Sequence, residues 1–512
     1  MDIVENFADR INGILQTFDR MLINGYFSHL FNYGKFLYYL IKNDVKLKDF
    51  KGFANEQTGL LCSHIENYIK DNNVNLTYLA SGKTNKDEAA RRVFSEGASR
   101  TGLVAAFSVL ELCKTMTVVP NHETKQLEVS SRETKCKHYY LYYNDEEFGW
   151  MFFKIQTWFP YNAQIYINGR EYLSKLLDKN NIKYEMYDNS FSYIEDFDKA
   201  QELADSILNK KLSNSFDGIA RKINSLLPNI ERVFHAGYYW CIDQCEFATD
   251  INFKNRDALG SIYKTLVETA YFTFSSHDIY SFFGRRLDKI HTFRKGEIVS
   301  DLRRRYQGYR IKFKINNNQV KMYDKGNNLR IEVTINNPRD FKVLKHEVDE
   351  ATGEATETKK WVPMGKSIVN LYRYAEVSKS IVGRYINALP EIDGDKLSVK
   401  ALTSISQRKD VNGRIYSAFN ILNGDTLNLF IAISDGAYLI NGFNNKLLRQ
   451  KLFLDSNSKG NINKTTRLIA KLRAHKIIKK VPKKNRYYLT KSGRKIINSI
   501  LLYTNKELLN AA

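Results

Sequence analysis

The segment that most constrains the fold is a pair of alternating apolar runs, residues 320–325 and 329–335, joined by Gly326-Asn327-Asn328. Alternation with a period of two is typical of β-strands, and a turn of this composition supplies the positive φ that a tight hairpin requires. The sequence therefore predicts a β-hairpin over residues 320–335.

Four side chains of this hairpin suit phosphodiester chemistry. Tyr323 and Lys325 share a face of the first strand, and Arg330 and Glu332 share a face of the second. A phenol can attack phosphorus, cations can hold phosphate, and a carboxylate can bind a divalent metal. The same residues can equally form ordinary cross-strand charge pairs on an exposed hairpin. Both interpretations stay open on this segment alone.

A second segment, residues 245–253, carries two further carboxylates. Glu246 and Asp250 point to one side whether the segment is a strand or a helix, with Ala248 between them. Such a pair repels, so it needs a metal ion, a shared proton or a basic neighbour. The alternative is a solvated edge strand whose carboxylates pair with Lys or Arg.

Together these segments resemble the trans-acting replication initiators of small rolling-circle plasmids and, more loosely, filamentous-phage replication proteins. The matching motifs, all within about residues 235–345, are Glu246-x-Ala248-x-Asp250, Tyr323-Asp324-Lys325 and Arg330-x-Glu332. The resemblance implies a metal-dependent strand nickase whose tyrosine becomes covalently joined to a DNA 5′ phosphate. Glu246 departs from the family pattern, where an aspartate is usual. The chain also looks like a large uncharacterised bacterial family that shares the segments Asn168-Gly169-Arg170-Glu171 and Glu246 to Asp250.

The resemblance implies a role for each matching residue. Tyr323 would be the nucleophile, Lys325 and Arg330 would contact phosphate, and the metal ligands would be Glu246, Asp250 and Glu332. No His-apolar-His motif occurs in the chain, so carboxylates must hold the metal, and oxygen ligands favour Mg²⁺ or Mn²⁺ over Zn²⁺. Two alternatives are a metal-dependent nuclease that uses water and a noncatalytic winged-helix regulator that binds DNA or RNA.

The charge balance favours a nucleic-acid partner, most simply DNA. Lys and Arg total 78 against 56 Asp and Glu, a formal net charge of +22. This excess attracts phosphate backbones and makes binding sensitive to salt. A membrane partner is not expected, because no apolar run approaches the roughly 18 residues needed to span a bilayer.

The cysteines and the first residues indicate a cytoplasmic location. Five scattered cysteines, an odd number, argue against a disulfide framework and for a reducing compartment. The N-terminal residues lack the basic flank and apolar core of a signal peptide.

The pattern along the chain predicts an α+β protein with four parts. Residues 1–125 are expected to be a helical N-terminal region, because apolar residues recur at helical spacing in 27–41 and 95–115. Residues 126–345 are expected to form a mixed α/β catalytic domain, and residues 346–423 an acidic loop with a helical connector. The aromatic strands near 138–167 either stack unpaired bases or form the core of a sheet.

Residues 424–512 resemble a winged-helix DNA-binding domain. Three short helices, at 427–433, 445–453 and 464–475, precede a strand, a basic turn and a second strand. No acidic residue lies between Asp455 and Glu507. The residues expected to contact DNA are Lys464, Arg467, Lys471, Arg473, Lys479, Lys480, Lys483, Lys484 and Arg486. The alternative is a winged helix used for protein contacts.

These observations together predict a DNA-processing protein whose winged helix selects the DNA site on which the protein acts. The catalytic domain would nick a nearby strand, as in replication initiation or transfer of a mobile element.

Overall fold

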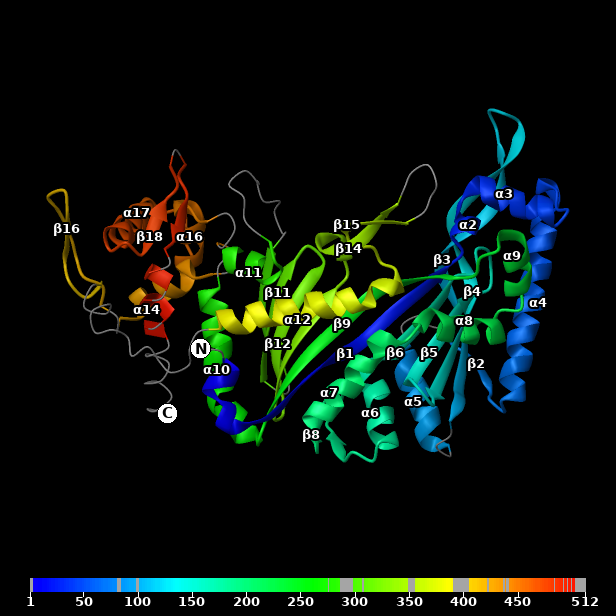
Figure 1. Ribbon diagram of the computed structural model, residues 1–512. Helices are drawn as coiled ribbons and strands as arrows, with labels where there is room; N and C mark the ends of the chain where they lie inside the picture. The colour runs from blue at the N-terminus through cyan, green and yellow to red at the C-terminus, as the bar shows by residue number, and fades with distance from the viewer. Residues whose placement is uncertain are drawn as a thin grey trace. The chain divides into compact units, whose positions relative to one another are not determined.

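The structure is a computed structural model, and it contains both helices and strands, which confirms the α+β class. It describes residues 3–80, 84–97, 101–274, 276–285, 298–305, 308–348, 355–389, 405–420, 423–435, 438, 442–482, 484–490, 492–494, 496–498 and 500–501. Figure 1 shows the ribbon of the chain.

The chain divides into two compact units. The first unit comprises Met1–Ile14, Thr249–Val333 and Ser378–Ala512, and the second comprises Leu15–Ala248 and Thr334–Val377. The division falls within three strands, which are β1 (Ile11–Tyr26), β9 (Tyr239–Phe253) and β13 (Asn328–Ile335).

The second unit is built on long antiparallel strands. Their order of hydrogen-bonded neighbours is β9-β1-β6-β5-β4-β3-β2, and only the β2–β3 pair is parallel among the registers of this unit. Besides β9 and β1, these strands are β2 (Leu76–Tyr78), β3 (Gly102–Asn121), β4 (Gln126–Asp145), β5 (Gly149–Gln156) and β6 (Ala163–Asn168). Its main helices are α3 (Tyr33–Lys42), α4 (Phe50–Asp71), α5 (Lys86–Glu96), α6 (Gly169–Lys179), α7 (Phe197–Asp205), α8 (Leu212–Ile223) and α9 (Leu227–Phe234).

The expectation that residues 1–125 are helical is correct only in part. The helices α3, α4 and α5 confirm it, but β1 has 16 residues and β3 has 20. Residues 103–109 of β3 are buried without interruption, because α4 and α5 both contact this strand. A strand covered in this way lacks the polar-apolar alternation that distinguishes it from a helix.

The aromatic run of β4 belongs to the core of the second unit. Tyr139, Tyr140, Tyr142 and Tyr143 are all at most 9% exposed. Tyr140 and Tyr142 pack with Ala90 of α5, whereas the Tyr139 hydroxyl donates a hydrogen bond to a carboxylate of α4. The core interpretation of this run is therefore confirmed, and its rings are not available to stack on bases.

The acidic segment within residues 346–423 is not one loop, because its two ends belong to the two strands of a β-hairpin. Strand β14 (Lys342–Val348) pairs with β15 (Ala355–Pro363), and the residues between them lie outside the described part. The helical connector is α12 (Leu371–Ala388), as predicted.

The first unit holds the predicted hairpin. Its strand order is β10-β11-β12-β13-β9-β1, with β10 (Ile298–Arg305), β11 (Gly308–Ile315) and β12 (Asn318–Lys325). Gly326 has φ of +80° in the turn between β12 and β13, a conformation that favours glycine. The hairpin prediction is confirmed.

Helices cover the strands of the first unit through an aromatic cluster. The helices are α10 (Arg256–Thr273), α11 (Ser276–Phe282) and the second half of α12. The rings of Phe274, Phe282, Phe313 and Tyr385 lie 4.8–6.2 Å apart between centroids. Mutually packed rings of this kind give the sheet a fixed support.

The C-terminal segment has the predicted order of elements and a core of its own. It consists of α14 (Gly424–Ile433), α16 (Asn445–Leu452), α17 (Lys459–Ala474), β18 (Ile478–Lys480) and β19 (Tyr487–Leu489). Asn444 caps α16 and Ser458 caps α17, each through its side chain. The two strands are antiparallel, with Lys479 opposite Tyr488.

Within the described residues, no helix combines the length and the apolar character needed to cross a bilayer.

Candidate functional site

Strand β9 places Glu246 and Asp250 as the sequence predicts. Both lie in a 15-residue strand, four residues apart, so both side chains point to the same face. Each residue is 2% exposed. A carboxylate in such an environment needs a partner of opposite charge or a set of hydrogen bonds.

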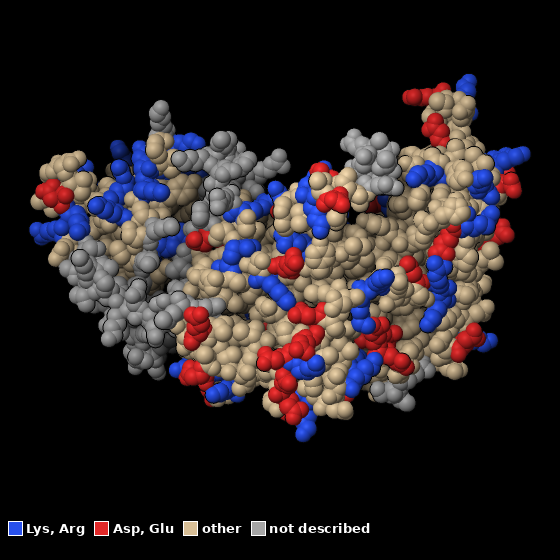
Figure 2. Space-filling view, viewed as in Figure 1, with Lys and Arg blue, Asp and Glu red and all other residues tan. Residues whose placement is uncertain are grey.

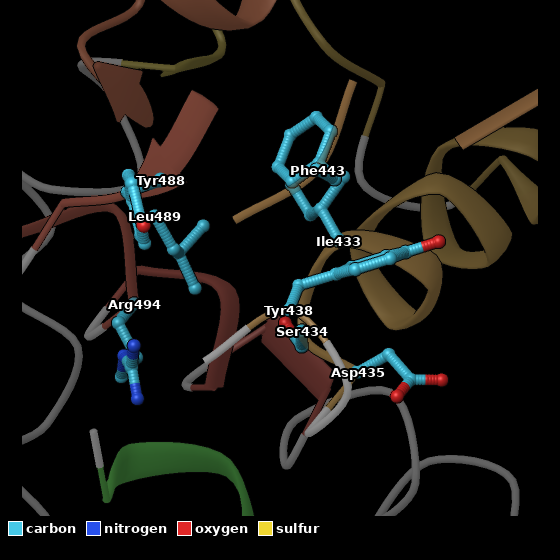
Figure 3. A pocket seen from close by; sticks show the side chains of 8 residues that line it. All are labelled: Ile433, Ser434, Asp435, Tyr438, Phe443, Tyr488, Leu489 and Arg494. Carbon is cyan, nitrogen blue, oxygen red and sulfur yellow. The ribbon is translucent and has the colours of Figure 1, made fainter. Parts of the chain in front are cut away.

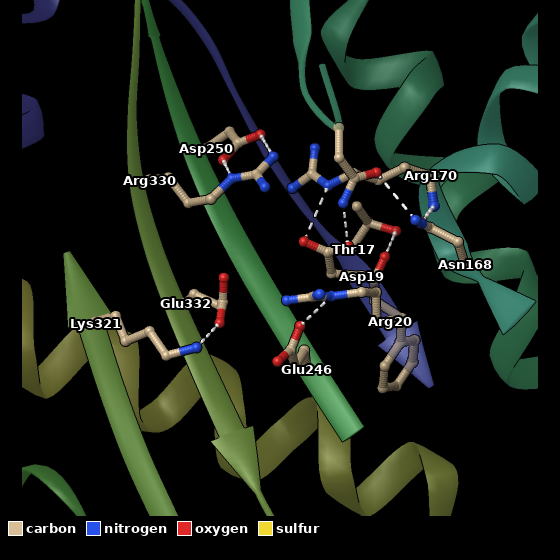
Figure 4. Close-up of polar contacts among 12 residues, drawn as sticks. Thr17, Asp19, Arg20, Asn168, Arg170, Glu246, Asp250, Lys321, Arg330 and Glu332 are labelled. Atoms are coloured by element: carbon tan, nitrogen blue, oxygen red, sulfur yellow. Dashed lines mark hydrogen bonds and ion pairs between the residues drawn. The ribbon is translucent and has the colours of Figure 1, made fainter. Parts of the chain in front are cut away.

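In the first unit, Asp250 is held by Arg330. The Nε of Arg330 donates to one carboxylate oxygen at 2.8 Å and Nη2 donates to the other at 3.0 Å (Figure 4). Arg330 is 1% exposed. A buried two-point contact of this type fixes geometry strongly, because both groups lose hydration and each needs the other. Both oxygens of Asp250 are engaged with Arg330, so this pair is built to hold β13 against β9.

The predicted nucleophile Tyr323 donates its hydroxyl to Glu332 in the same unit. The distance from Tyr323 Oη to one Glu332 oxygen is 2.5 Å, and Lys321 Nζ lies 2.5 Å from the other oxygen. Glu332 is 2% exposed, whereas Tyr323 is half-buried. A phenol that is accessible and bonded to a buried carboxylate is a suitable arrangement for proton transfer.

The pKa of Glu332 lies below its ordinary value in this arrangement. Burial opposes its ionisation, but the charge of Lys321 and the hydrogen bonds from Lys321 and Tyr323 outweigh burial and lower the pKa of Glu332. Lys325, the other predicted cation of β12, is buried at 8% exposure. Lys321, four residues earlier on the same strand, is the cation that reaches the carboxylate.

In the second unit, Glu246 has two donors. Arg20 Nε donates to Oε2 at 2.8 Å, and Gln244 Nε2 donates to Oε1 at 3.0 Å. The Arg20 side chain is 54% exposed although its partner is buried. The guanidinium therefore connects a buried carboxylate to the surface.

Asp19 of β1 is a further buried carboxylate beside Glu246. One oxygen of each lies within 4.8 Å of the other, and Asp19 is 2% exposed. Asp19 accepts a hydrogen bond from Asn189, and Arg170 Nε lies 3.9 Å from its carboxylate. Two close carboxylates with oxygen donors can hold a hard divalent cation.

The Asn168-Gly169-Arg170 segment positions this group (Figure 4). The Asn168 side chain caps α6 by accepting from the Arg170 backbone N–H at 2.9 Å. A Cβ on Gly169 would collide with the carbonyl of Phe18, so only glycine allows α6 to begin this close to β1. Arg170 is fully buried at 0% exposure. This start of α6 brings Arg170 close to Asp19.

Sequence reasoning missed Asp19, Arg20, Arg170 and Lys321. Asp19 and Arg20 fall in a region expected to be helical, so their place on a strand beside Glu246 was hidden. Arg170 had a signal, because its segment stood out in the sequence without an assigned role. Lys321 shares the alternation that identifies Tyr323, and extending that face by one step finds it.

The residues of the C-terminal segment that are predicted to contact DNA differ in their solvent exposure. Lys464, Arg467, Arg473, Lys479, Lys480 and Lys484 are exposed, and Figure 2 shows Lys and Arg gathered over α17 and β18. Arg486 is half-buried, and Lys483 lies outside the described residues. Lys471 instead donates to the Ala418 carbonyl at 2.9 Å and lies 4.1 Å from the centre of the Phe419 ring. Its main contacts are therefore internal.

A small pocket lies in the C-terminal segment (Figure 3). Its lining includes Tyr438, Phe443, Tyr488 and Arg494. A cavity volume of about 20 Å³ accommodates a water molecule and excludes a nucleotide. This pocket is not a candidate for substrate binding.

Comparison of the chain with protein-family models, curated proteins and solved structures gave no match.

The Arg330–Asp250 contact leads to the first prediction. The Asp250→Asn variant keeps the shape of the side chain but removes the charge that faces a buried guanidinium. We expect it to lower the free energy of unfolding by about 3–5 kcal/mol, measured by urea unfolding followed by circular dichroism.

The matched control is Arg303→Gln in the same unit, whose side chain is 63% exposed and paired with Asp301. We expect a decrease of no more than about 1 kcal/mol for this exposed pair. Equal effects of the two substitutions would show that the buried contact does not hold the strands.

Proposed function

We propose that the chain is a DNA strand nickase that uses Tyr323 as its nucleophile, as in replication initiation or transfer of a mobile element. The observation that carries the proposal is the 2.5 Å hydrogen bond from the Tyr323 hydroxyl to the buried carboxylate of Glu332. Tyr139 and Tyr140 of the core also donate to carboxylates, but Tyr323 differs from them because it is only half-buried and can reach a substrate. Nucleophilic tyrosines do need a group that takes their proton.

The proposed step conserves atoms and charge. Tyr323 Oη attacks the phosphorus of a DNA strand, and its proton passes to Glu332 as the new O–P bond forms. The bond from phosphorus to the 3′ oxygen breaks, and that oxygen takes a proton from water. The product is a free 3′ hydroxyl and a 5′ phosphate joined to Tyr323. Lys321 stabilises Glu332 before the transfer and offers positive charge to the phosphate.

The metal ligands are best assigned to Glu246 with Asp19. Their oxygens are hard donors within 4.8 Å of each other, and this chemistry fits Mg²⁺ or Mn²⁺. Asp250 has both oxygens bonded to Arg330, and Glu332 has its oxygens bonded to Lys321 and Tyr323. Glu246 likewise accepts from Arg20 and Gln244, so an ion bound there would replace one of these contacts. A divalent ion bound by such carboxylates would polarise a phosphoryl oxygen. In this proposal Arg330 and Asp250 are positioning residues.

The proposed DNA reader is the C-terminal segment, as a winged helix. Its three helices followed by a two-stranded hairpin support this assignment, since the third helix of such a domain enters the major groove. The exposed Lys464 and Arg467 lie on α17, and Lys479 and Lys480 lie on β18. These residues would contact phosphates and set the register on the duplex.

A noncatalytic DNA- or RNA-binding regulator is the second candidate. The observation that favours it is that each buried carboxylate has a cationic partner within its own unit: Arg330 for Asp250, Lys321 for Glu332, and Arg20 for Glu246. Charge pairs of this kind also occur in purely structural networks.

The second prediction tests the nucleophile. Tyr323→Phe removes one hydroxyl, so it should abolish cleavage of single-stranded and supercoiled DNA in Mg²⁺ or Mn²⁺. Glu332→Gln removes the proton acceptor and should lower the cleavage rate by roughly 10²–10⁴-fold. Both variants should bind DNA as the unmodified chain does. The readout is a gel assay for nicked product.

The matched control is Tyr309→Phe, which alters a tyrosine on the neighbouring strand β11 that is 41% exposed. It should cleave normally. Full cleavage by Tyr323→Phe that chelator still abolishes would support a water-using nuclease instead. Absence of cleavage by the unmodified chain on every substrate would support the regulator.

The third prediction tests the proposed wing. The double variant Lys479→Ala/Lys480→Ala should weaken duplex binding, and the slope of log K against log salt should fall by about 0.9 for each phosphate that these lysines neutralise. The control variant Lys345→Ala/Lys359→Ala removes two exposed charges from the β14–β15 hairpin of the second unit. If both double variants change the slope equally, only the net charge matters and the wing is not on DNA.

A further inference from the structure

Two thiols and an imidazole meet on one face of the β3–β4 hairpin in the second unit. In the register of these strands Cys113 lies opposite Thr134, and Cys136 lies opposite Glu111. Cys113 and Cys136 are therefore diagonal neighbours with side chains on the same face. His138, two residues after Cys136, points to that face as well.

The three donor groups converge closely. The two Sγ atoms are 2.7 Å apart, and Cys136 Sγ lies 3.9 Å from His138 Nδ1. One ligand atom from each of Cys113, Cys136 and His138 lies within 4.8 Å of the other two. His138 is 3% exposed and the cysteines are half-buried, so the group is anchored at one end and open to solvent at the other.

The backbone orients the imidazole for metal binding. His138 Nδ1 lies 3.1 Å from the carbonyl oxygen of Cys136, which can only accept. That hydrogen bond places a proton on Nδ1, so Nε2 is the ring nitrogen that can offer a lone pair to a metal ion. Zinc-binding histidines are commonly held in this manner by a carbonyl group.

We propose that Cys113, Cys136 and His138 bind a soft divalent metal ion, Zn²⁺ being the best match. Two sulfurs and one nitrogen are the donors that Zn²⁺ prefers over Mg²⁺, and three protein ligands leave the fourth tetrahedral position for water. This site differs in donor chemistry from the oxygen ligands of the proposed nickase. It would fix β3 to β4 midway along a hairpin of two 20-residue strands.

A disulfide between Cys113 and Cys136 accounts for the arrangement less well. Diagonal residues of antiparallel strands have Cα atoms roughly 7–8 Å apart, whereas disulfides usually need about 4.4–6.8 Å. A disulfide also gives no role to His138. Two Zn–S bonds of about 2.3 Å at a tetrahedral angle would place the sulfurs roughly 3.8 Å apart. They would have to move about 1 Å farther apart than their present 2.7 Å, by rotation about the two Cα–Cβ bonds.

The acidic residue nearest to the three donors is engaged by lysines, so it does not compete with them as a metal ligand. Glu111, directly opposite Cys136, is the nearby acid that could compete as a ligand. Its carboxylate instead contacts Lys86, Lys154 and the Tyr140 hydroxyl at 2.7–3.1 Å. Glu111 is therefore an anion that is already neutralised in place.

The test uses the full chain, stripped of metal under reducing conditions and titrated with Zn²⁺ or Co²⁺. We expect one tight ion per chain and, with Co²⁺, the near-ultraviolet absorption of a cobalt–thiolate bond. Cys113→Ser, Cys136→Ser and His138→Asn should each weaken binding by more than the roughly 10–100-fold that follows removal of an outer partner. Cys62→Ser, which alters a half-buried thiol on α4, should bind as the unmodified chain does.

A second measurement does not depend on variants that fold. Zn²⁺ should protect Cys113 and Cys136 of the unmodified chain from alkylation, located by peptide mass spectrometry, while Cys62 reacts at the same rate with or without Zn²⁺. The proposal would be overturned if, in the presence of Zn²⁺, Cys113 and Cys136 were alkylated as fast as Cys62. Absence of the cobalt–thiolate absorption would also overturn it. So would a Cys113–Cys136 disulfide in a chain purified without reductant that binds no metal after reduction.

Discussion

The buried contact between Arg330 and Asp250 is the interaction on which the geometry of the candidate site depends. Both groups are almost fully removed from water, so each would cost several kcal/mol of free energy without the other. The two-point contact allows one relative position of β9 and β13. Because strands alternate with a period of two, fixing Arg330 also fixes Glu332 on the same face. The hydrogen bond from Tyr323 to Glu332 follows from that placement.

The same principle recurs among the other buried acids. Glu332 is paired with Lys321, Glu246 with Arg20, and Asp19 lies near Arg170. Buried ion pairs rarely add much net stability, because desolvation offsets their attraction. They do restrict the arrangement, since a misplaced strand leaves a charge without its partner.

The sequence predicts those parts of the fold that depend on local pattern. The β12–β13 hairpin follows from alternation and a Gly-Asn turn, and the C-terminal elements follow from short periodic runs. The long strands β1 and β3 were expected to be helices. In β3 the buried run of residues 103–109 has no polar face, because helices contact the strand and tertiary packing overrides the local signal.

The candidate site is predictable to the same extent. The strands that carry four of the site residues show their alternation of apolar and polar residues in the sequence. The structure brings these residues into direct contact in two pairs, Tyr323 with Glu332 and Arg330 with Asp250. The pairing of Arg330 with Asp250 rather than with phosphate was not predictable, because it joins residues 80 positions apart. The approach of Asp19 to Glu246 depends on β1, which was expected to be helical.

The most direct test of the central claim is to identify the atom that bonds to DNA. The unmodified chain is incubated with a single-stranded oligonucleotide and Mg²⁺, digested with protease and nuclease, and its peptides are sequenced by mass spectrometry. The account predicts a nucleotide 5′ phosphate on the β12 peptide, located at Tyr323, and an unmodified Tyr309 peptide. Cleaved DNA with no nucleotide on any tyrosine, or a nucleotide on a tyrosine other than Tyr323, would contradict it.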